Sequence, residues 1–288
     1  MGRSSASIER IISQAIAIEA EEAQEAGALG YMARAMIQAT LPHRKVEGHT
    51  FERSNGNYTL SIIANPRIGL PYGSMPRLLL SWVTTEAVRT RSRELVLGDS
   101  LSGFMRELGL IPTGGRWGTI TTLKNQSTRL FGSVFQAYYS DKESRESAIL
   151  NKTIVDGAHF WWDHQNPEQL GMWNSVIKLS EQFFDEVIHH PIPIDMRAIK
   201  ALKGSALALD IYSWLTYRAS YLTHQTEIPW EVLSLQFGAN YNRLRDFKAA
   251  FCAELRKVLL LYNEAHANMT DTGILLKPAK PHIAGRPK

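Results

Sequence analysis

The sequence contains a single cysteine, Cys252, among its 288 residues. One thiol excludes an intramolecular disulfide, cannot by itself form a structural zinc site, and is typical of a protein in a reducing cytoplasm. Cys252 falls in a segment with helical periodicity. We predict that it packs as a small core residue rather than acting as a nucleophile.

Long apolar runs are also absent. No window approaches the ~20 consecutive apolar residues that a membrane-spanning helix requires. Near the N-terminus, Glu9, Arg10 and Gln14 interrupt the apolar run that a secretory signal would need. We therefore expect a cytoplasmic protein that makes no contact with a membrane.

Two common catalytic motifs are missing from the sequence. There is no G-x-x-x-x-G-K-[ST] motif of a nucleotide-binding P-loop and no G-x-S-x-G motif of a hydrolase nucleophile. An ATP-driven activity is therefore not supported. We expect no catalytic residue, no cofactor and no metal ion.

One catalytic alternative rests on the adjacent Tyr138 and Tyr139, a pair that is found in some DNA-nicking enzymes. Such enzymes hold a metal ion with clustered histidines. Here His159, Asp163 and His164 would share a metal ion only on a helix, and the aromatic residues around them favour a strand. We favour the simpler interpretation, a tyrosine pair in the core of a β-ribbon.

Acidic residues are few in the body of the chain. The net charge is +4, and residues 1–30 contribute −3 of it (two Arg, five Glu), so the remainder carries about +7. No Asp or Glu lies between Glu107 and Asp141. A basic body suggests an anionic partner, of which nucleic acid is the commonest large one, although solubility alone would also explain the charge.

The acidic N-terminal segment has a pattern of its own. Residues 8–38 predict one or two helices that are broken near Gly27 and Gly30 and closed by Pro42. Their surplus of carboxylates should keep them away from phosphate. We expect them to pack on the body of the protein or to meet another protein.

The next segment alternates between strands and helices. Residues 58–64 predict a strand, Ser74 is the expected N-cap of an amphipathic helix, and residues 94–98 are long enough only for a short strand. Asp99 or Ser100 should cap a second helix. That helix has an apolar stripe and a glycine stop.

The stop is Gly109, in the position of a left-handed residue at a helix end, and a third helix should follow Pro112–Gly115. One face of the third helix is apolar: Ile120, Leu123, Ser127, Leu130 and Val134. The other face and its flanks carry hydroxyls, an amide and cations without a carboxylate: Arg116, Thr121, Thr122, Lys124, Asn125 and Arg129. Such groups hydrogen-bond base edges and phosphates.

A β-ribbon is expected to follow the third helix, in residues 133–140 and 147–163. Helix, strand, helix, helix and β-ribbon is the order of a winged helix. The sequence from 189 to 196 then predicts a proline-bounded linker, after which the same order of elements recurs.

In this second unit the last helix should begin near Asn240. We expect an inner face of Leu244, Phe247, Phe251, Leu255 and Val258, and a polar face with flanking cations: Asn242, Arg243, Arg245, Lys248 and Arg256. Residues 268–283 supply the second ribbon, with Lys277 and Lys280 in its basic surroundings. We expect a flexible basic tail from 281 to 288, which ends in a sequence similar to a minor-groove hook.

These patterns predict a mostly α fold with small β-ribbons (α+β) and two tandem winged-helix domains. The expected divisions are a helical segment at 1–48, domains at 49–190 and 191–280, and the tail at 281–288.

Four segments resemble the plasmid-encoded RepA family of replication initiators: residues 72–110, which begin YGSMPRLLLSW, 114–131, 201–218 and 240–251. The resemblance extends from about Tyr58 to Leu276. It implies a protein that binds repeated double-stranded sites (iterons) at a bacterial plasmid origin, promotes opening of the origin, and recruits the host initiator and helicase machinery. It also implies that the protein is not an enzyme.

The resemblance places sequence reading on the third helix of each domain. By position, these residues are Thr121, Thr122, Asn125 and Arg129 in the first domain, and Asn242, Arg245 and Lys248 in the second. A transcriptional repressor of the same fold and a tyrosine-dependent nicking enzyme are the alternatives. Whether the active form is a monomer or a homodimer is left open.

Overall fold

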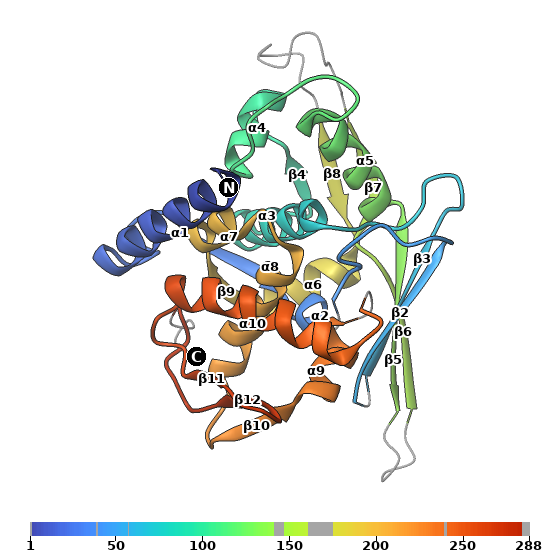
Figure 1. Cartoon of the computed structure of the whole chain (residues 1–288). Coiled ribbons are helices and arrows are strands. Elements are labelled where there is room, and N and C mark those ends of the chain that lie inside the picture. Colours follow the sequence, from blue (N-terminus) through green and yellow to red (C-terminus); the bar gives the residue numbers. More distant parts are fainter. Residues whose placement is uncertain are drawn as a thin grey trace.

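The computed structural model describes residues 2–38, 40–56, 58–140, 147–160, 175–238 and 241–283. They form a mixed α+β structure in which small antiparallel sheets lie around the edges of a central group of helices (Figure 1). No helix of this described part is long and apolar enough to cross a membrane.

A first set of elements runs from the middle of the chain. It comprises α3 (Ser74–Thr90), β4 (Glu94–Val96), α4 (Leu101–Glu107), α5 (Thr119–Phe131), β7 (Val155–His159) and β8 (Val176–Leu179). The strands form a sheet in the order β4-β8-β7. The helices predicted after Ser74, Ser100 and Gly115 are thus confirmed, as is the short strand.

A second set repeats this order. It comprises α8 (Ala206–Ala219), β10 (Thr226–Pro229), α9 (Trp230–Phe237), α10 (Leu244–Leu261), β11 (Ala267–Met269) and β12 (Gly273–Leu276). Its strands have the order β10-β12-β11. In both sets the first strand pairs with the third and the third with the second, so the two sets share their topology as well as their element order.

Local chemistry explains where the helices of the first set begin and end. The Ser100 hydroxyl accepts a hydrogen bond from Gly103 N at 3.1 Å, and Gly109 has the left-handed φ of 71° that a helix end favours. The predicted capping by Ser74 is wrong. Ser74 is already helical, and Gly73 occupies the N-cap position without a side-chain hydrogen bond.

The β-ribbon predicted directly after α5 has a different place. β5 (Ser133–Ser140) and β6 (Ser147–Thr153) form a hairpin that pairs with β3 (Tyr58–Ala64), and β3 pairs in turn with β2 (Thr50–Asn55). The ribbon of the first set is β7–β8 instead. Period-2 patterning shows that residues 133–153 are strands but does not reveal their partners, which is why the prediction merged two hairpins.

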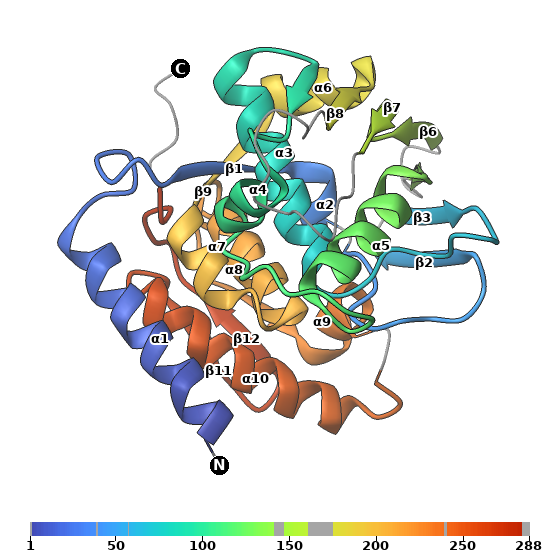
Figure 2. The same cartoon turned by 90° about the horizontal axis from the view of Figure 1, so that it is seen from above.

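The N-terminal segment contains α1 (Gly2–Ala20), β1 (Leu29–Ala33) and α2 (Arg34–Gln38). β1 was not predicted. It pairs with β9 (Pro191–Asp195). The segment predicted to be a linker therefore forms one strand of a two-stranded sheet. The remaining helices, α6 (Glu181–His189) and α7 (Met196–Leu202), flank β9 in the chain. α1 lies along α10 and α7, as expected for a helix that packs on the body (Figure 2).

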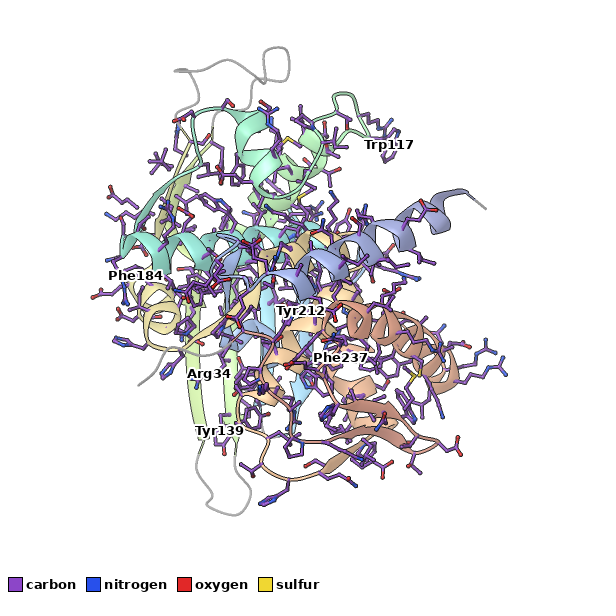
Figure 3. The ribbon with its side chains drawn as sticks, turned by 90° about the vertical axis from the view of Figure 1, so that its left-hand side faces the viewer. Arg34, Trp117, Tyr139, Phe184, Tyr212 and Phe237 are labelled. Carbon is purple, nitrogen blue, oxygen red and sulfur yellow. The ribbon has the colours of Figure 1, made fainter. Side chains whose placement is uncertain are left out.

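α3 and α8 lie at the centre of one continuous hydrophobic core that spans both sets. Both are buried around most of their circumference, because each is packed on several sides by other elements. Large aromatic residues such as Tyr212 and Phe237 point into this core (Figure 3).

Candidate nucleic-acid interface

α5 presents a polar face to solvent. Its buried stripe is Ile120, Leu123, Ser127 and Leu130, which confirms the predicted inner face within the helix. The prediction is wrong for Val134, which lies beyond the helix on β5 and is 37% exposed. The exposed residues on the other side are Thr122, Lys124, Asn125 and Thr128. No carboxylate lies on this helix. The outer face can therefore donate hydrogen bonds to bases or phosphates without an acidic competitor.

Arg129 differs from the other predicted residues because it folds back onto the protein. Its Nη1 donates to Leu70 O at 3.1 Å, and its guanidinium lies 5.7 Å from the centre of the Tyr72 ring. At Gly69, which has a φ of 80°, a Cβ would come within 2.5 Å of the same Nη1. Arg129 thus holds α5 against the loop that precedes α3.

The loop before α5 is fixed by hydrogen bonds at both ends. Thr113 and Thr119 bond reciprocally, each backbone N–H to the other's hydroxyl, at 2.9 Å. Thr121 Oγ1 donates to Gly115 O at 2.8 Å, and a Cβ at Gly118 would lie 2.3 Å from backbone oxygens of the same loop. A side chain at position 118 would clash with these oxygens, so the turn requires glycine there.

The tip of this loop carries Arg116 and Trp117. Trp117 is 87% exposed, and the Arg116 guanidinium lies 5.2 Å from the centre of its ring. Figure 3 shows the indole projecting away from the body of the protein. Trp117 was not among the predicted site residues; the signal that could have found it is an aromatic residue beside an arginine between glycines.

α10 has the same place in the second set as α5 has in the first. Phe247, Phe251, Leu255 and Val258 are buried, as predicted. Leu244 was predicted to face inward but is 39% exposed, because it is the first residue of the helix and lies beyond the edge of the core.

The polar residues of α10 are less free than those of α5. Asn242 is exposed and lies before the helix rather than in its first turn. Asp246 lies 2.8 Å from Arg243 Nε and 3.4 Å from Arg245 Nε. Exposed ion pairs of this kind contribute only about 0–1 kcal/mol. Both guanidiniums could therefore turn to a phosphate or a base at little cost.

Lys248 connects α10 to the β-ribbon of its own set. Its Nζ donates to Asp271 O at 2.9 Å and lies 5.2 Å from the centre of the Trp230 ring. Lys277 and Lys280 are exposed beyond β12. The cations of the second set thus lie on the helix and on the segment that follows the ribbon.

The start of the predicted tail is packed on the protein. The His282 ring stacks on Tyr262 at 4.7 Å, and its Nδ1 lies 2.7 Å from the Tyr212 hydroxyl. Burial lowers the pKa of His282. Flexibility was predicted for the tail from residue 281, but His282 is held; the hook-like end at 284–288 lies outside the described residues.

The residues of the catalytic alternative do not form one site where they are described. Tyr138 and Tyr139 lie on β5 and are 40% and 45% exposed, so the prediction of a buried tyrosine pair is wrong. His159 lies on β7, in a different sheet, and Asp163 and His164 fall outside the described residues. Within the described ranges no three His, Cys, Asp or Glu side chains gather as a metal site.

Cys252 is half-buried and packs against the core, as expected of a small core residue. Burial raises the pKa of its thiol, which disfavours the nucleophilic thiolate.

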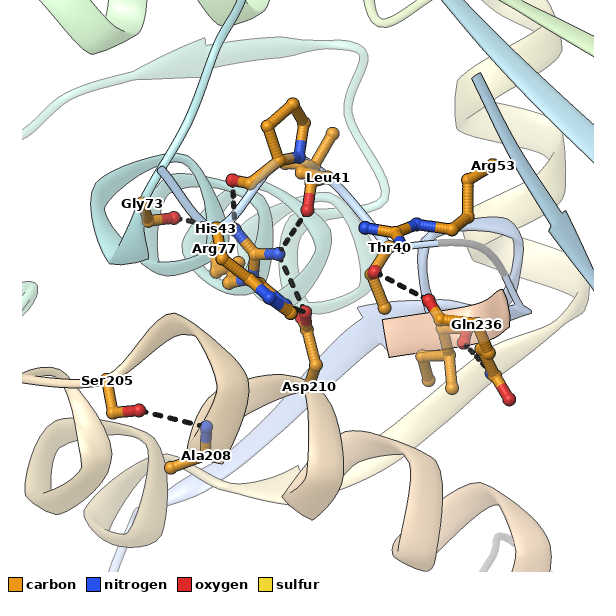
Figure 4. Close-up of polar contacts among 12 residues, drawn as sticks. Thr40, Leu41, His43, Arg53, Gly73, Arg77, Ser205, Ala208, Asp210 and Gln236 are labelled. Carbon is orange, nitrogen blue, oxygen red and sulfur yellow. Dashed lines mark hydrogen bonds and ion pairs between the residues drawn. The ribbon is translucent and has the colours of Figure 1, made fainter. Parts of the chain in front are cut away.

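A buried ionic cluster joins the two sets (Figure 4). Arg77 of α3 bonds Asp210 of α8 through Nε to Oδ1 at 2.6 Å and through Nη2 to Oδ2 at 2.7 Å. The Arg77 guanidinium also donates to Leu41 O at 2.7 Å and Gly73 O at 2.6 Å. His43 Nε2 lies 2.8 Å from Asp210 Oδ2. The first helices of the two sets are therefore fixed to each other by charge-assisted hydrogen bonds.

In this cluster Asp210 is charged and His43 is neutral, because the pKa of each group is lowered. Burial alone would raise the pKa of Asp210, but the Arg77 charge and the hydrogen bonds from His43 and Arg77 outweigh it and lower the pKa. Burial lowers the pKa of His43 more than its contact with Asp210 raises it. Because an ionised carboxylate only accepts hydrogen bonds, the proton of the neutral imidazole lies on Nε2.

A structure made of small α+β units with an exposed, acid-free helix face has the features of a nucleic-acid-binding protein. Residues 70–234, more than half of the chain, match the family described as plasmid encoded RepA protein. The chain belongs to this family of plasmid replication proteins. No curated protein matches the sequence.

Two solved structures have a similar fold. The crystal structure of selenomethionine derivatives of domains 2 and 3 of RctB aligns with 88% of this chain and 97% of its own, with a TM-score of 0.58 and 11% identity. A crystal structure of RctB domains 2–3 aligns with 84% of this chain and 96% of its own, with a TM-score of 0.51 and 12% identity. At these identities the likeness concerns the fold alone.

Proposed function

We propose that this protein initiates plasmid replication by binding repeated double-stranded sites at the origin through two winged-helix domains. The domains correspond to the two sets of elements, which share the order helix, strand, helix, helix, ribbon and the same strand pairing. Membership of the RepA family supports the role in replication. The observation that carries the proposal is the recurrence of an exposed polar helix, α5 or α10, at the same place in both sets.

In the first domain, α5 enters the major groove. Thr122 and Asn125 face outward and reach base edges, since an asparagine amide can bond an adenine through two hydrogen bonds. Lys124 holds a flanking phosphate. Arg129 sets the angle of the helix through its bond to Leu70 O, and the Thr121 hydroxyl steadies the loop before it.

In the second domain, Asn242 and Arg245 read bases near the start of α10, where docking of a recognition helix usually places base contacts. Arg243, Lys248, Lys277 and Lys280 hold phosphates. The contact of Lys248 with Asp271 O links the helix to the ribbon, so both can follow the same stretch of DNA backbone.

The cluster of Arg77, Asp210 and His43 fixes the distance between the two recognition helices. Because both recognition helices must enter the major groove at the same time, a fixed distance between them selects DNA sites whose two half-sites are separated by a matching distance. Binding at several adjacent repeats then bends and strains the duplex, which promotes its opening. Host initiator and helicase proteins are recruited by surfaces away from the DNA, and α1, with its acidic end, is one such surface. In this role the protein acts by binding and not by catalysis.

Footprinting on the DNA that flanks the gene tests the proposal. We expect protection of several similar sites at regular spacing, and autonomous replication of a plasmid that carries the gene together with these sites. Protection of a single promoter site without support of replication would instead indicate a repressor. Strand cleavage of supercoiled origin DNA in the presence of Mg²⁺ would indicate a nicking enzyme.

A further inference from the structure

The loop at residues 111–118 carries an aromatic surface that the proposed duplex contacts do not use. Trp117 is 87% exposed and Ile111, at the other end of the loop, is 75% exposed. An exposed tryptophan costs free energy in water, since its indole is among the largest apolar groups in proteins. This loop is therefore a candidate contact site in its own right.

Hydrogen bonds hold the loop in one conformation. Thr119 Oγ1 donates to Ile111 O at 2.6 Å, and Gly118 N donates to Gly115 O at 3.1 Å. Together with the reciprocal Thr113–Thr119 pair, these bonds fix both ends and the tip. The backbone at Trp117 is thus held in place before a partner arrives, so that less backbone conformational entropy is lost on contact.

The charges around the loop favour a nucleic acid over a protein as the partner. Arg116 lies against the indole, Lys124 is exposed on the first turns of α5, and the sequence has no Asp or Glu between Glu107 and Asp141. An aromatic ring beside cations, with no carboxylate nearby, is the combination that binds unpaired bases: the ring stacks and the cations follow the backbone.

A paired base does not offer its face to the indole, because its neighbours in the duplex cover it. We propose that Trp117 stacks on an unpaired base of the opened origin, with Arg116 on the adjacent phosphate, and so holds single-stranded DNA beside the duplex that α5 binds. This inference rests on the proposed role in origin opening. It adds a second class of ligand, single-stranded DNA, and names the residue that recognises it.

The test compares three variants: Trp117→Ala, Trp117→Phe and Leu235→Ala. Leu235 is a matched control because it is an exposed apolar residue on α9, at 61% exposure. Each variant is titrated by fluorescence anisotropy against an oligothymidine of about 16 nucleotides, the upper end of typical single-strand site sizes, and against the footprinted duplex repeat.

We expect Trp117→Ala to weaken binding of the oligothymidine by about tenfold or more, in line with the loss of one stacked base. Trp117→Phe should retain most of this binding, and Leu235→Ala should leave it unchanged. The affinity for the duplex repeat should change less than about threefold in all three. Thermal unfolding of Trp117→Ala should match that of the unaltered protein, because the side chain is almost fully exposed.

A second readout follows the origin itself. At equal occupancy of the duplex repeats, permanganate should oxidise fewer unpaired thymines at the origin with Trp117→Ala than with the unaltered protein. The inference is overturned if the unaltered protein does not bind the oligothymidine, or if Trp117→Ala binds it equally well. It is also overturned if that variant weakens duplex and single strand in parallel, or loses only the binding of a host protein. Failure of the proposed function would show differently, as the absence of any specific duplex binding.

Discussion

Arg77 and Asp210 lie 133 residues apart in the sequence and form a two-point ion pair, with Nε–Oδ1 and Nη2–Oδ2 distances of 2.6 and 2.7 Å. Arg77 is 4% exposed and Asp210 is 9% exposed. The pair joins α3 to α8, the first helices of the two repeated sets. A buried pair of this kind costs much in desolvation, so its value lies in fixing one arrangement of the two helices.

Asp210→Asn should lower the free energy of unfolding by about 3–5 kcal/mol, the usual effect of leaving a buried charge without its partner. Urea unfolding measures it. The double variant Arg77→Met with Asp210→Leu should regain much of the loss, because it removes both charges. Asp246→Asn, which breaks exposed pairs on α10, should change the free energy by no more than about 1 kcal/mol. Equal effects of Asp210→Asn and Asp246→Asn would contradict the importance of the buried pair.

The stability of the protein should fall as the pH drops through and below the ordinary histidine pKa of 6.5. Burial lowers the pKa of both His43 and His282 below the ordinary value of 6.5. The unfolded chain then binds protons more readily than the folded one in the window below 6.5, and acid favours unfolding there. The pKa of Asp210 is lowered from 3.8, so its contribution is lost only at more acidic pH.

Urea unfolding at a series of pH values measures this slope. His43→Gln keeps a donor for Asp210 without a titrating ring and should flatten the slope; combined with His282→Gln it should flatten it further. Identical slopes for the double variant and the unaltered protein would show that neither histidine is responsible.

Two N-terminal deletions should behave differently. Deleting residues 2–20 removes α1, which packs on α10 and α7 from outside; within its described part, residues 8–20, Ile11 is the one buried side chain. Specific DNA affinity should survive this deletion. Deleting residues 2–33 also removes β1, the partner of β9, and leaves the edge of β9 unpaired. That chain should be strongly destabilised. Loss of origin binding by the first deletion, in a chain that still folds, would place α1 within the DNA-binding surface.

Much of the two repeated sets could be predicted from the sequence, because their signals are local. Spacings of three and four residues gave α5 its buried stripe, and Gly109 marked a helix end. What could not be predicted depends on distant pairing. β1 is a strand only because β9 lies beside it, and the β5–β6 hairpin joins β3 rather than β7.

The candidate site shows the same division. Periodicity identified Thr122 and Asn125 as outward-facing residues, which the structure also has. It could not show that Arg129 bends back to Leu70 O, since that loop lies 59 residues earlier. Arg77 and Asp210 carried a signal, because each is a charged residue in the mostly apolar first half of its helix, but nothing in the sequence paired them.

Neighbouring residues on α5 should separate reading of bases from holding of phosphates. Asn125 and Lys124 are both exposed, and neither is needed for the core. Asn125→Ala should weaken binding to the origin repeat by about tenfold while barely changing affinity for a scrambled duplex, because an amide that bonds a base discriminates by ~1–3 kcal/mol. Lys124→Ala should weaken both duplexes about equally and reduce the slope of log K against log salt by about one. Anisotropy titrations of both duplexes across a salt series measure the two effects. A parallel loss of both affinities in Asn125→Ala would mean that this side chain holds the backbone, and that the bases are read elsewhere on the helix.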